Sequence, residues 1–574
     1  MTRRSLRRTT GAIASVAAIL FPGAAFAQVL TAVPTFHIAN GQNAGPQEQD
    51  GGPGHEQGDI TYVKVGEKVY VVTVYMSSKV EEGLWQGKCT SIEFGPDGQP
   101  TVVADQVQIS DYPEGDRPFN HPRIATDELT GKVIVIFGSD AVNGDAANTS
   151  TYVTALDHMC NRVADVTRVS NNANNNEGAG DIHCHKNGKC TAGYLSTGNN
   201  DTSFALGLQI NDLGGGQVSI ERTWLKGVVA PSNIGRPAIT SSTDDRALFC
   251  AAKGDNRPPE DGVQCAMLDT ADGTILYKQI IAASQPGEKI YMNQPTVGAL
   301  DNGRFAVQVL ESSGQGKITN EKGSNVTHAY VIEPQLDSFL VKDHKVGLGS
   351  YHTHSAICAG AYGLEGKRHF GILGAPVTGN GQPSFQLLSY DATTGIAQDK
   401  TMNKWVVGWY GDSGKLANLY GANPGTQGRD FLRCKGDVPN PGFGQPNGYL
   451  PHVKTFFVTP HSGRIDGEEK NSQWLSFVPG HTSEVVQPAA PTDPTSIEPG
   501  PSDNGYTGNP EPPKPAPQDD PIPGTDNDKD PSVLTSPSSG GCAVSGDEDD
   551  LSGAAGLALV GLGLVMASRR RKGV

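Results

Sequence analysis

A short segment recurs along the middle of this 574-residue chain about every 60 residues. In each copy a polar residue precedes proline or a small residue and then an apolar run, as in His121-Pro122-Arg123-Ile124 and Gln294-Pro295-Thr296-Val297. The copies begin at residues 57, 121, 179, 236, 294 and 354, so successive starts lie 64, 58, 57, 58 and 60 residues apart. Such a regular period is typical of repeat architectures, in which one supersecondary unit is copied and stacked.

Each unit is predicted to contain four β-strands. The recurring segment starts the first strand, and a polar turn leads into a second apolar run, for example 132–137. Turns such as Asp97-Gly98 and Asp272-Gly273 then separate the third and fourth runs, and Asp-Gly between apolar runs favours a hairpin. A single four-stranded sheet cannot bury both faces unless neighbours stack on it. We therefore expect an all-β fold, a β-propeller.

The number of blades is predicted from the fourth strands. Candidates occur near residues 30, 101, 163, 218, 274, 337 and 396, which gives seven blades; six and eight stay open because 405–460 does not divide cleanly. The segment 30–37 reads as a fourth strand placed before the first unit, and 474–478 as a late strand of an incomplete unit. Strands from the two ends of the chain would then share one blade and close the ring, leaving no free sheet edge.

The first 27 residues have the layout of a secretion signal. Four arginines precede the apolar run 11–21, and small residues follow up to Ala27. The run Thr2-Arg3-Arg4-Ser5-Leu6 also resembles a twin-arginine signal, so general secretion and twin-arginine export are both open. The mature chain is predicted to begin at Gln28.

The last 34 residues, 541–574, repeat these components in reverse. Gly541 and Cys542 precede an acidic spacer, the apolar run 553–567 and a cluster of arginines at 569–571. Fifteen apolar residues fall short of the roughly 20 of a spanning helix, although a basic cluster behind them is typical of a cytoplasmic stop. The order of elements resembles the MYXO-CTERM sorting domain of myxobacterial surface proteins. The resemblance implies processing by envelope sorting machinery, Cys542 as a candidate lipid anchor, and display at the outer membrane.

Between these ends lie a body and a linker. Residues 481–540 are rich in Pro, Asp, Ser and Thr and nearly lack aromatic residues, which predicts a disordered linker. Residues 28–480 form the predicted propeller domain. The net charge of −16 argues against nucleic acid as a partner, because binding phosphates requires a basic face.

Cysteine usage fits an exported protein. Eight of the nine cysteines lie in the body, an even number that predicts disulfide bonds. Cys250 and Cys265 flank a polar loop between two apolar runs, so they are candidates to bridge neighbouring strands.

The repeat also predicts where a ligand would bind. The innermost strands of a propeller surround a central channel, so equivalent residues of the recurring segment should form a ring at its mouth. The candidate ligand-binding residues are Gln57, Asp59, His121, Asp181, Arg236, Gln294 and His354. The alternative is that these side chains only hydrogen-bond the channel wall and its water.

Two His-x-His pairs suggest a transition metal. In a strand, residues i and i+2 share a face, so His183 with His185, and His352 with His354, could each offer two imidazoles to one ion. Segments 140–145 and 171–181 supply the oxygen ligands that calcium takes, but without the spacing of a known calcium loop. Solvated turns and ordinary strand histidines are the competing interpretations.

A long segment, 405–449, interrupts the pattern of short connections. It contains the aromatic residues Trp405, Trp409, Tyr410 and Tyr420, which could stack on sugar rings or simply pack the loop against the propeller.

Two functions follow from these patterns. The first is a surface-displayed propeller that binds a protein or polysaccharide partner through the channel mouth without catalysis. The alternative is an exported glycan-active hydrolase or lyase with its site in the same place, or, less favoured, a His-metal oxidoreductase. The sequence leaves open whether the protein is an enzyme, because the standard motifs G-x-S-x-G and H-E-x-x-H are absent.

Overall fold

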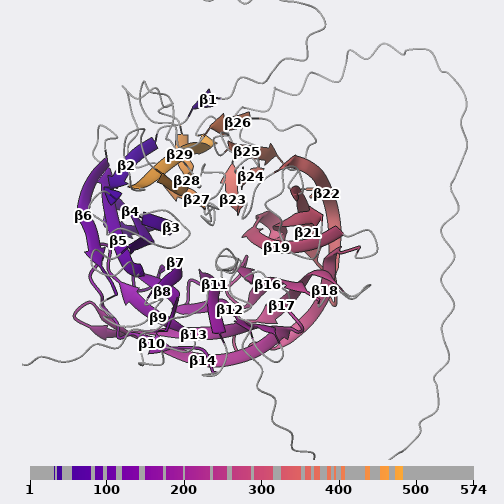
Figure 1. The fold of residues 1–574 in the computed structure, drawn as a ribbon, viewed down its shortest axis with the longest axis horizontal. Helices are drawn as coiled ribbons and strands as arrows, with labels where there is room; N and C mark the ends of the chain where they lie inside the picture. Colours follow the sequence, from indigo (N-terminus) through magenta and orange to yellow (C-terminus); the bar gives the residue numbers. More distant parts are fainter. Residues whose placement is uncertain are drawn as a thin grey trace, which may run out of the picture.

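The fold is a ring of seven small antiparallel sheets, seen along its axis in Figure 1. The computed structural model describes residues 31–32, 35–41, 55–78, 85–94, 100–110, 119–140, 149–171, 176–197, 201–232, 237–254, 261–285, 290–313, 325–350, 356–362, 368–374, 384–389, 393–395, 403–406, 434–439, 453–463 and 472–482. The predicted signal and tail lie outside these residues, as does the predicted linker 481–540 except for His481 and Thr482, which end strand β29 (Ser472–Thr482). Within them, no helix is long and apolar enough to cross a membrane.

Five blades follow one another in sequence, each with its first strand innermost. Blade 1 contains β3 (His55–Val65), β4 (Lys68–Ser78), β5 (Trp85–Phe94) and β6 (Pro100–Gln108). Blade 2 contains β7 (Asn120–Asp127), β8 (Lys132–Ser139), β9 (Ser150–Leu156) and β10 (Thr167–Arg168). Blade 3 contains β11 (Asn176–Cys184), β12 (Lys189–Thr197), β13 (Thr202–Gly214) and β14 (Gln217–Val229). Blade 4 contains β15 (Ala238–Thr240), β16 (Arg246–Lys253), β17 (Gly262–Asp269) and β18 (Ile275–Ala283). Blade 5 contains β19 (Ile290–Ala299), β20 (Phe305–Ser313), β21 (Asn325–Pro334) and β22 (Phe339–Ser350), with the 3₁₀ turn Asp301–Gly303 after β19.

The last two blades combine strands from both ends of the chain. Blade 6 contains β23 (Ala356–Tyr362), β24 (Arg368–Gly374), β25 (Ser384–Ser389) and β26 (Asn403–Val406), and β1 (Thr31–Ala32) pairs in parallel with β26. Blade 7 contains β27 (Lys435–Pro439), β28 (Val453–Gly463) and β29 (Ser472–Thr482), with β2 (Thr35–Ala39) as its outer strand. The predicted seven blades, and the shared blade that joins the two ends, are confirmed.

The hydrophobic core is divided into layers that lie between neighbouring blades. One cluster joins Ile134 and Val153 of blade 2 to Ala192 and Leu206 of blade 3. Similar clusters join blades 1 and 2, 3 and 4, 4 and 5, 5 and 6, and 7 and 1. Each sheet of blades 1–5 therefore buries both of its faces against a neighbour on each side, as the repeat arithmetic requires.

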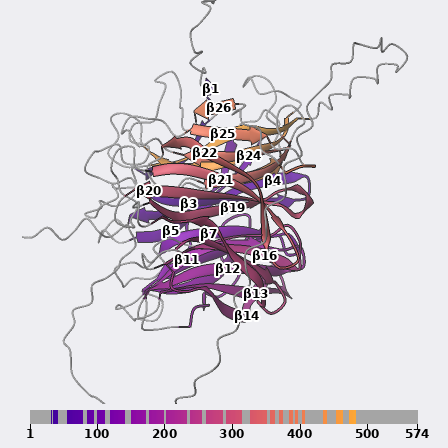
Figure 2. The ribbon, with the colours of Figure 1, turned by 90° about the vertical axis from the view of Figure 1, so that its right-hand side faces the viewer.

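The ring has two faces, which we name by what lies at them. Seen from the side, the strands run roughly through the thickness of the disc, from one face to the other (Figure 2). The innermost strands begin at the loop face, where the chain passes from one blade to the next and from each second strand to its third. They end at the hairpin face, where the first strand turns into the second and the third into the fourth. Turns of neighbouring blades meet at the hairpin face, since the Lys186 amide donates to Asp244 Oδ1 at 3.0 Å.

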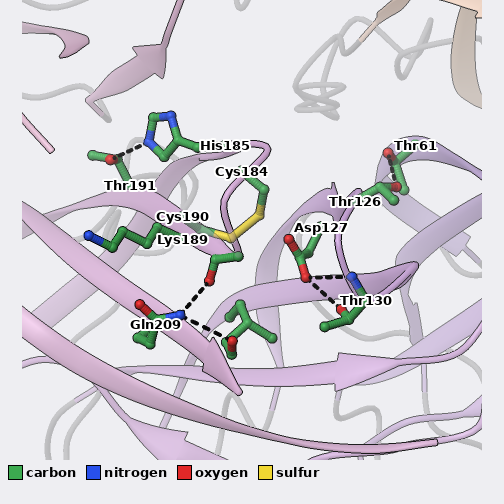
Figure 3. The surroundings of a disulfide bond; sticks show 12 residues. Thr61, Thr126, Asp127, Thr130, Cys184, His185, Lys189, Cys190, Thr191 and Gln209 are labelled. Carbon is green, nitrogen blue, oxygen red and sulfur yellow. Dashed lines mark hydrogen bonds between the residues drawn. A yellow bond between two sulfur atoms is a disulfide. The ribbon is translucent and has the colours of Figure 1, made fainter. Parts of the chain in front are cut away.

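Four disulfides reinforce this arrangement. Cys250–Cys265 joins the paired strands β16 and β17, as predicted, and Cys184–Cys190 closes the hairpin between β11 and β12 (Figure 3). Cys89–Cys160 links blades 1 and 2, and Cys358–Cys434 links β23 of blade 6 to the residue before β27. Two of the four bonds therefore join neighbouring blades. Four disulfides are typical of an exported protein.

The two kinds of disulfide predict different losses of stability. Replacing Cys358 and Cys434 by serine removes a bond across 76 residues, which should lower the free energy of unfolding by about 4 kcal/mol if the bond restricts the unfolded chain. Replacing Cys184 and Cys190, six residues apart, should cost about 2 kcal/mol. Guanidinium unfolding of both double variants measures the difference. Equal losses would contradict the prediction.

Candidate functional site

The recurring segment forms a β-bulge near the loop face of the innermost strands. In four of the six copies, two residues on the inner strand face one on the second strand, at 57–58, 121–122, 180–181 and 294–295, and the inner strand of blade 7 has a similar bulge at 436–437. His121 and Gln294 have positive φ angles of 48° and 45°, which residues other than glycine rarely adopt. The sequence repeat is thus the signature of a repeated backbone irregularity, a feature often found beside functional sites.

Two of the acidic candidates connect neighbouring blades. The amides of Ile60 and Ile124 donate to the two carboxylate oxygens of Asp59 at 2.8 and 2.9 Å, so Asp59 in blade 1 holds the inner strand of blade 2. Asp181 in blade 3 repeats the contact, accepting from the amides of Ile182 at 2.9 Å and Ile239 of blade 4 at 3.1 Å. Both carboxylates therefore have a structural role at the junctions between blades.

A neutral side chain makes the same junction between blades 5 and 6. The Ile357 amide donates to Thr296 Oγ1 at 3.0 Å, and the Thr296 hydroxyl donates to Gln308 Oε1 at 2.6 Å. The three junctions start from blades 1, 3 and 5. In blades 2, 4 and 6 the equivalent positions hold Arg123, Ala238 and Ala356, so the inner strands of blades 1–6 alternate between two kinds.

Removing Asp59 should destabilise the fold. In Asp59→Ala two buried amides lose their acceptor, which predicts a loss of about 3 kcal/mol in the free energy of unfolding. Glu128→Ala, an exposed carboxylate in the turn after β7, is the control and should change it little. Chemical denaturation compares the two. A loss no larger than that of the control would remove the proposed junction role.

Blade 2 supplies two basic residues at the loop face among those that the structure describes. His121 and Arg123 of blade 2 are both almost completely buried, with exposed fractions of 2% and 0%. The His121 amide contacts Met76 Sδ of blade 1 at 3.4 Å, and Arg123 Nη1 donates to the carbonyl of Pro122 at 2.6 Å. Both basic side chains are therefore buried near the loop-face end of β7.

Blade 5 adds neutral polar side chains at the same level. Asn293 and Gln294 are buried at the bulge of β19. Glu177, near the start of β11, is a buried carboxylate whose Oε2 lies 3.8 Å from Arg168 Nη2 of blade 2. Glu177 lies within the segment 171–181 that suggested calcium, but sequence reasoning did not single it out.

Several candidates cannot be placed in this site. Arg236, His352, His354, Trp409, Tyr410, Tyr420 and Cys542 lie outside the described residues. Gln57 lies in the bulge of β3, although its side chain is outside what the structure describes, as is that of Trp405 in β26. Of the predicted ring, the structure describes the side chains of His121, Gln294 and the two junction carboxylates.

The His183-x-His185 pair lies near the hairpin-face end of β11. The two rings are neighbours, with centroids 5.3 Å apart, as the strand periodicity predicts. His185 Nε2 is 2.9 Å from Thr191 Oγ1 (Figure 3). Within the described part of the chain, no group of three or more His, Cys, Asp or Glu side chains is arranged to hold a metal ion.

His183 stays uncharged at acidic pH. Burial lowers its pKa to about 3, and the positive charges of His185 and of Lys435 from blade 7 act in the same direction. An imidazole that resists protonation in this way donates or accepts hydrogen bonds as a neutral group.

The depressed pKa of His183 predicts acid sensitivity. The unfolded chain takes up a proton at this residue below pH of about 6.5, whereas the folded chain does so only near pH 3. The stabilisation is complete above about pH 6.5 and decreases by about 1.4 kcal/mol per pH unit as the pH falls toward 3. His183→Gln should therefore lose less stability than the wild type between neutral pH and pH of about 5. Melting temperatures across this range test the difference, and parallel curves would contradict it.

A second polar cluster lies on the outer strands of blade 5, away from the axis. Glu311 Oε2 is 2.8 Å from His328 Nε2, and His328 Nδ1 is 2.9 Å from His344 Nε2. With Glu311 ionised and both rings neutral, His328 donates to Glu311 and accepts from His344, which leaves His344 Nδ1 as an acceptor. Tyr330 stacks on His344 with ring centroids 4.1 Å apart.

Burial governs the acid–base properties of this cluster. It lowers the pKa of His344, an effect increased by His328 and opposed by Asp343, and it raises the pKa of Tyr330 to about 12 with the help of Glu311. Sequence reasoning missed the cluster because its members come from β20, β21 and β22. The only available signal was the alternation of His328, Tyr330 and apolar residues along one strand.

No known family model matches the chain, and no curated protein matches it. Similar solved structures include the GH93 α-L-arabinofuranosidase of Fusarium graminearum, with 8% identity over 63% of this chain and 93% of that one, and a TM-score of 0.39. A PL25 ulvan lyase has 9% identity over 78% and 95%, with a TM-score of 0.40. The NanB sialidase of Streptococcus pneumoniae has 9% identity over 77% and 71%, with a TM-score of 0.38. Identities this low concern the fold and carry no information about a reaction.

Proposed function

We propose that this exported propeller takes a polysaccharide at the loop-face end of its axis and acts on it as a hydrolase or lyase. The observation that carries the proposal is the pair of bulges at His121 and Gln294. Both residues keep a left-handed backbone conformation, which costs of order 1–3 kcal/mol unless the surroundings enforce it. Such strain at equivalent positions around one axis favours a functional use of the side chains held there.

The groups at this end of the axis suit a carbohydrate. The amides of Asn293 and Gln294 can donate and accept hydrogen bonds, as sugar hydroxyls require. The imidazole of His121 can transfer a proton, and Arg123, two residues further along β7, can stabilise negative charge that develops on a substrate. The aromatic residues of the segment 405–449 are predicted to supply flat surfaces on which sugar rings could stack.

Binding without cleavage is the second candidate, and a specific observation favours it. Hydrolysis of a glycosidic bond usually requires two free carboxyl groups. The carboxylates of Asp59 and Asp181 instead accept hydrogen bonds from backbone amides at the blade junctions. A lyase or a binding module needs no such pair. The names of the similar structures therefore serve only to choose assays, which should include both hydrolysis and elimination.

His121→Asn tests the proposed site. Asparagine tolerates the left-handed conformation, so the variant should keep the bulge and lose the imidazole. Against a panel of neutral and acidic polysaccharides, we expect a loss of activity of about a hundredfold, in line with removal of a proton-transfer group. The release of reducing ends measures hydrolysis, and ultraviolet absorbance of the unsaturated product measures elimination.

His344→Gln, which changes the outer cluster of blade 5, is the matched control and should keep wild-type activity. Equal melting temperatures would show that both variants fold. Binding without new chain ends would favour the second candidate. Unchanged binding and cleavage in His121→Asn would remove this site from the function.

A further inference from the structure

The disulfides differ in how far solvent reaches their cysteines. All four bonds belong to the described part of the chain, so they can be compared directly. In two of them both cysteines have an exposed fraction of 0%, namely Cys89–Cys160 and Cys250–Cys265. In a third, Cys190 is 1% exposed whereas Cys184 is partly exposed. One half of the Cys184–Cys190 bond therefore meets solvent while the other half is buried.

A second bond of the same arrangement isolates the effect of exposure. Cys184 lies directly opposite Cys190 in the pairing of β11 with β12, just as Cys250 lies opposite Cys265 in β16 and β17. The Cα atoms are 3.9 Å apart in the first bond and 4.1 Å apart in the second. Since the register and the Cα separation match, a difference in reactivity between these two bonds reports access to the cysteines.

The fourth bond has a different place in the fold. Cys434 is partly exposed, but its partner Cys358 is 76 residues away, and their bond joins β23 of blade 6 to the residue before β27. Cys184 and Cys190 are only six residues apart within one hairpin. Because a short loop restricts the unfolded chain less, the fold depends less on the Cys184–Cys190 bond.

The hairpin that carries this bond is also closed by other contacts. The His185 amide donates to the Lys189 carbonyl at 2.7 Å. The Gly188 carbonyl accepts from the Ile210 amide at 2.8 Å and from Gln209 Nε2 at 3.2 Å. These hydrogen bonds do not require the sulfur atoms, so the disulfide can open without unfolding the blade.

Neighbouring blades touch the hairpin on two sides. A Cβ atom added to Gly188 would lie 2.9 Å from Leu129 Cδ2 of blade 2. On the other side, the Lys186 amide donates to Asp244 Oδ1 of blade 4 at 3.0 Å. The disulfide itself packs in the core layer between blades 2 and 3. A bulky group added to its accessible sulfur has no room in this layer, and it must displace the hairpin from its neighbours.

We propose that Cys184 is the site at which a small thiol attacks this protein, and that the Cys184–Cys190 bond is a redox-sensitive link between the hairpin and blades 2 and 4. The attacking thiolate bonds to Cys184 Sγ, the S–S bond breaks, and Cys190 leaves as a thiolate that takes up a proton. A second thiol then attacks the mixed disulfide. Two small thiols are thereby oxidised to their own disulfide, and the protein gains two thiol groups.

The position of Cys184 suits a small reagent. It is the last residue of strand β11 rather than the tip of the turn, which is formed by the exposed Lys186 and Asn187. A small thiol can pass beside the turn to reach it. This inference is independent of the proposed function, because it concerns the hairpin face and needs no polysaccharide.

Graded reduction of the wild-type chain tests the order in which the bonds open. The folded mature chain is exposed to reduced glutathione, and new thiols are blocked with iodoacetamide. The remaining bonds are then reduced, labelled with N-ethylmaleimide and assigned by peptide mass spectrometry. Cys184–Cys190 should open at least about tenfold faster than Cys250–Cys265, because only the first bond has an accessible cysteine. The trapped glutathione adduct should be on Cys184.

Three results of this experiment would overturn the assignment. Equal rates for Cys184–Cys190 and Cys250–Cys265 would show that reduction requires unfolding of the chain. Earlier opening of Cys358–Cys434 would place the reactive bond elsewhere. An adduct on Cys190 would show that the buried cysteine is the one attacked.

Cys190→Ser tests the link to the neighbouring blades. Its free Cys184 reacts with oxidised glutathione to give the mixed disulfide and one glutathione thiol. Hydrogen exchange in the hairpin peptide, which includes the Lys186 amide, should be severalfold faster in the adduct than in the unmodified variant. The matched control is the turn after β21 in blade 5, where the Gln335 amide donates to the Ser338 carbonyl at 2.9 Å, and its exchange should not change.

The outcome of this second experiment separates the two parts of the proposal. Equal exchange with and without the adduct would overturn the link between the bond and the neighbouring blades. A Cys184 thiol that does not form the adduct in the folded variant would overturn the site itself.

Discussion

The fold depends on the junctions between inner strands. Each blade has two apolar faces, and the clusters that cover them join one blade to the next. Apolar packing alone would let neighbouring sheets slide, because it has no preferred direction. The hydrogen bonds from Asp59, Asp181 and Thr296 to an amide of the following blade set the height of one inner strand against the other. They also satisfy backbone groups that the bulges take out of the regular ladder.

These junctions explain why the inner strands of blades 1–6 alternate between two kinds. Blades 1, 3 and 5 supply the side-chain acceptor of each junction, from Asp59, Asp181 and Thr296. Blades 2, 4 and 6, which receive this contact at a backbone amide, have Arg123, Ala238 and Ala356 at the equivalent positions. A receiving blade needs only its amide for the contact, so its side chains are free to differ. The basic residues His121, Arg123 and Arg236 all belong to receiving blades.

Much of the fold could be predicted from the sequence, because the period survives even where the residues differ. The recurring segment located six inner strands, and the odd strands at the two ends predicted the shared blade. The interval 405–460 was not interpretable since β27 is short and lies far from β26. The site was less accessible. Asp59 and Asp181 occupy the predicted ring, but only coordinates reveal that backbone amides engage them. Glu311, His328 and His344 come together because of the register between β20, β21 and β22, and this register cannot be predicted from a single sequence.

The shared seventh blade imposes an order on how the molecule is made. The Gly41 amide donates to Ser472 Oγ at 3.0 Å, a contact between residues 431 positions apart. Strand β2 is among the first parts of the mature chain to be synthesised, and its partner β29 is among the last parts of the propeller. Until β29 arrives, β2 has no sheet to join, and pairing over such a separation is slow. A chain interrupted anywhere before residue 482 would remain an open arc with exposed sheet edges. Pairing of the final strand β29 with β2 therefore decides whether a newly exported molecule closes its ring or aggregates.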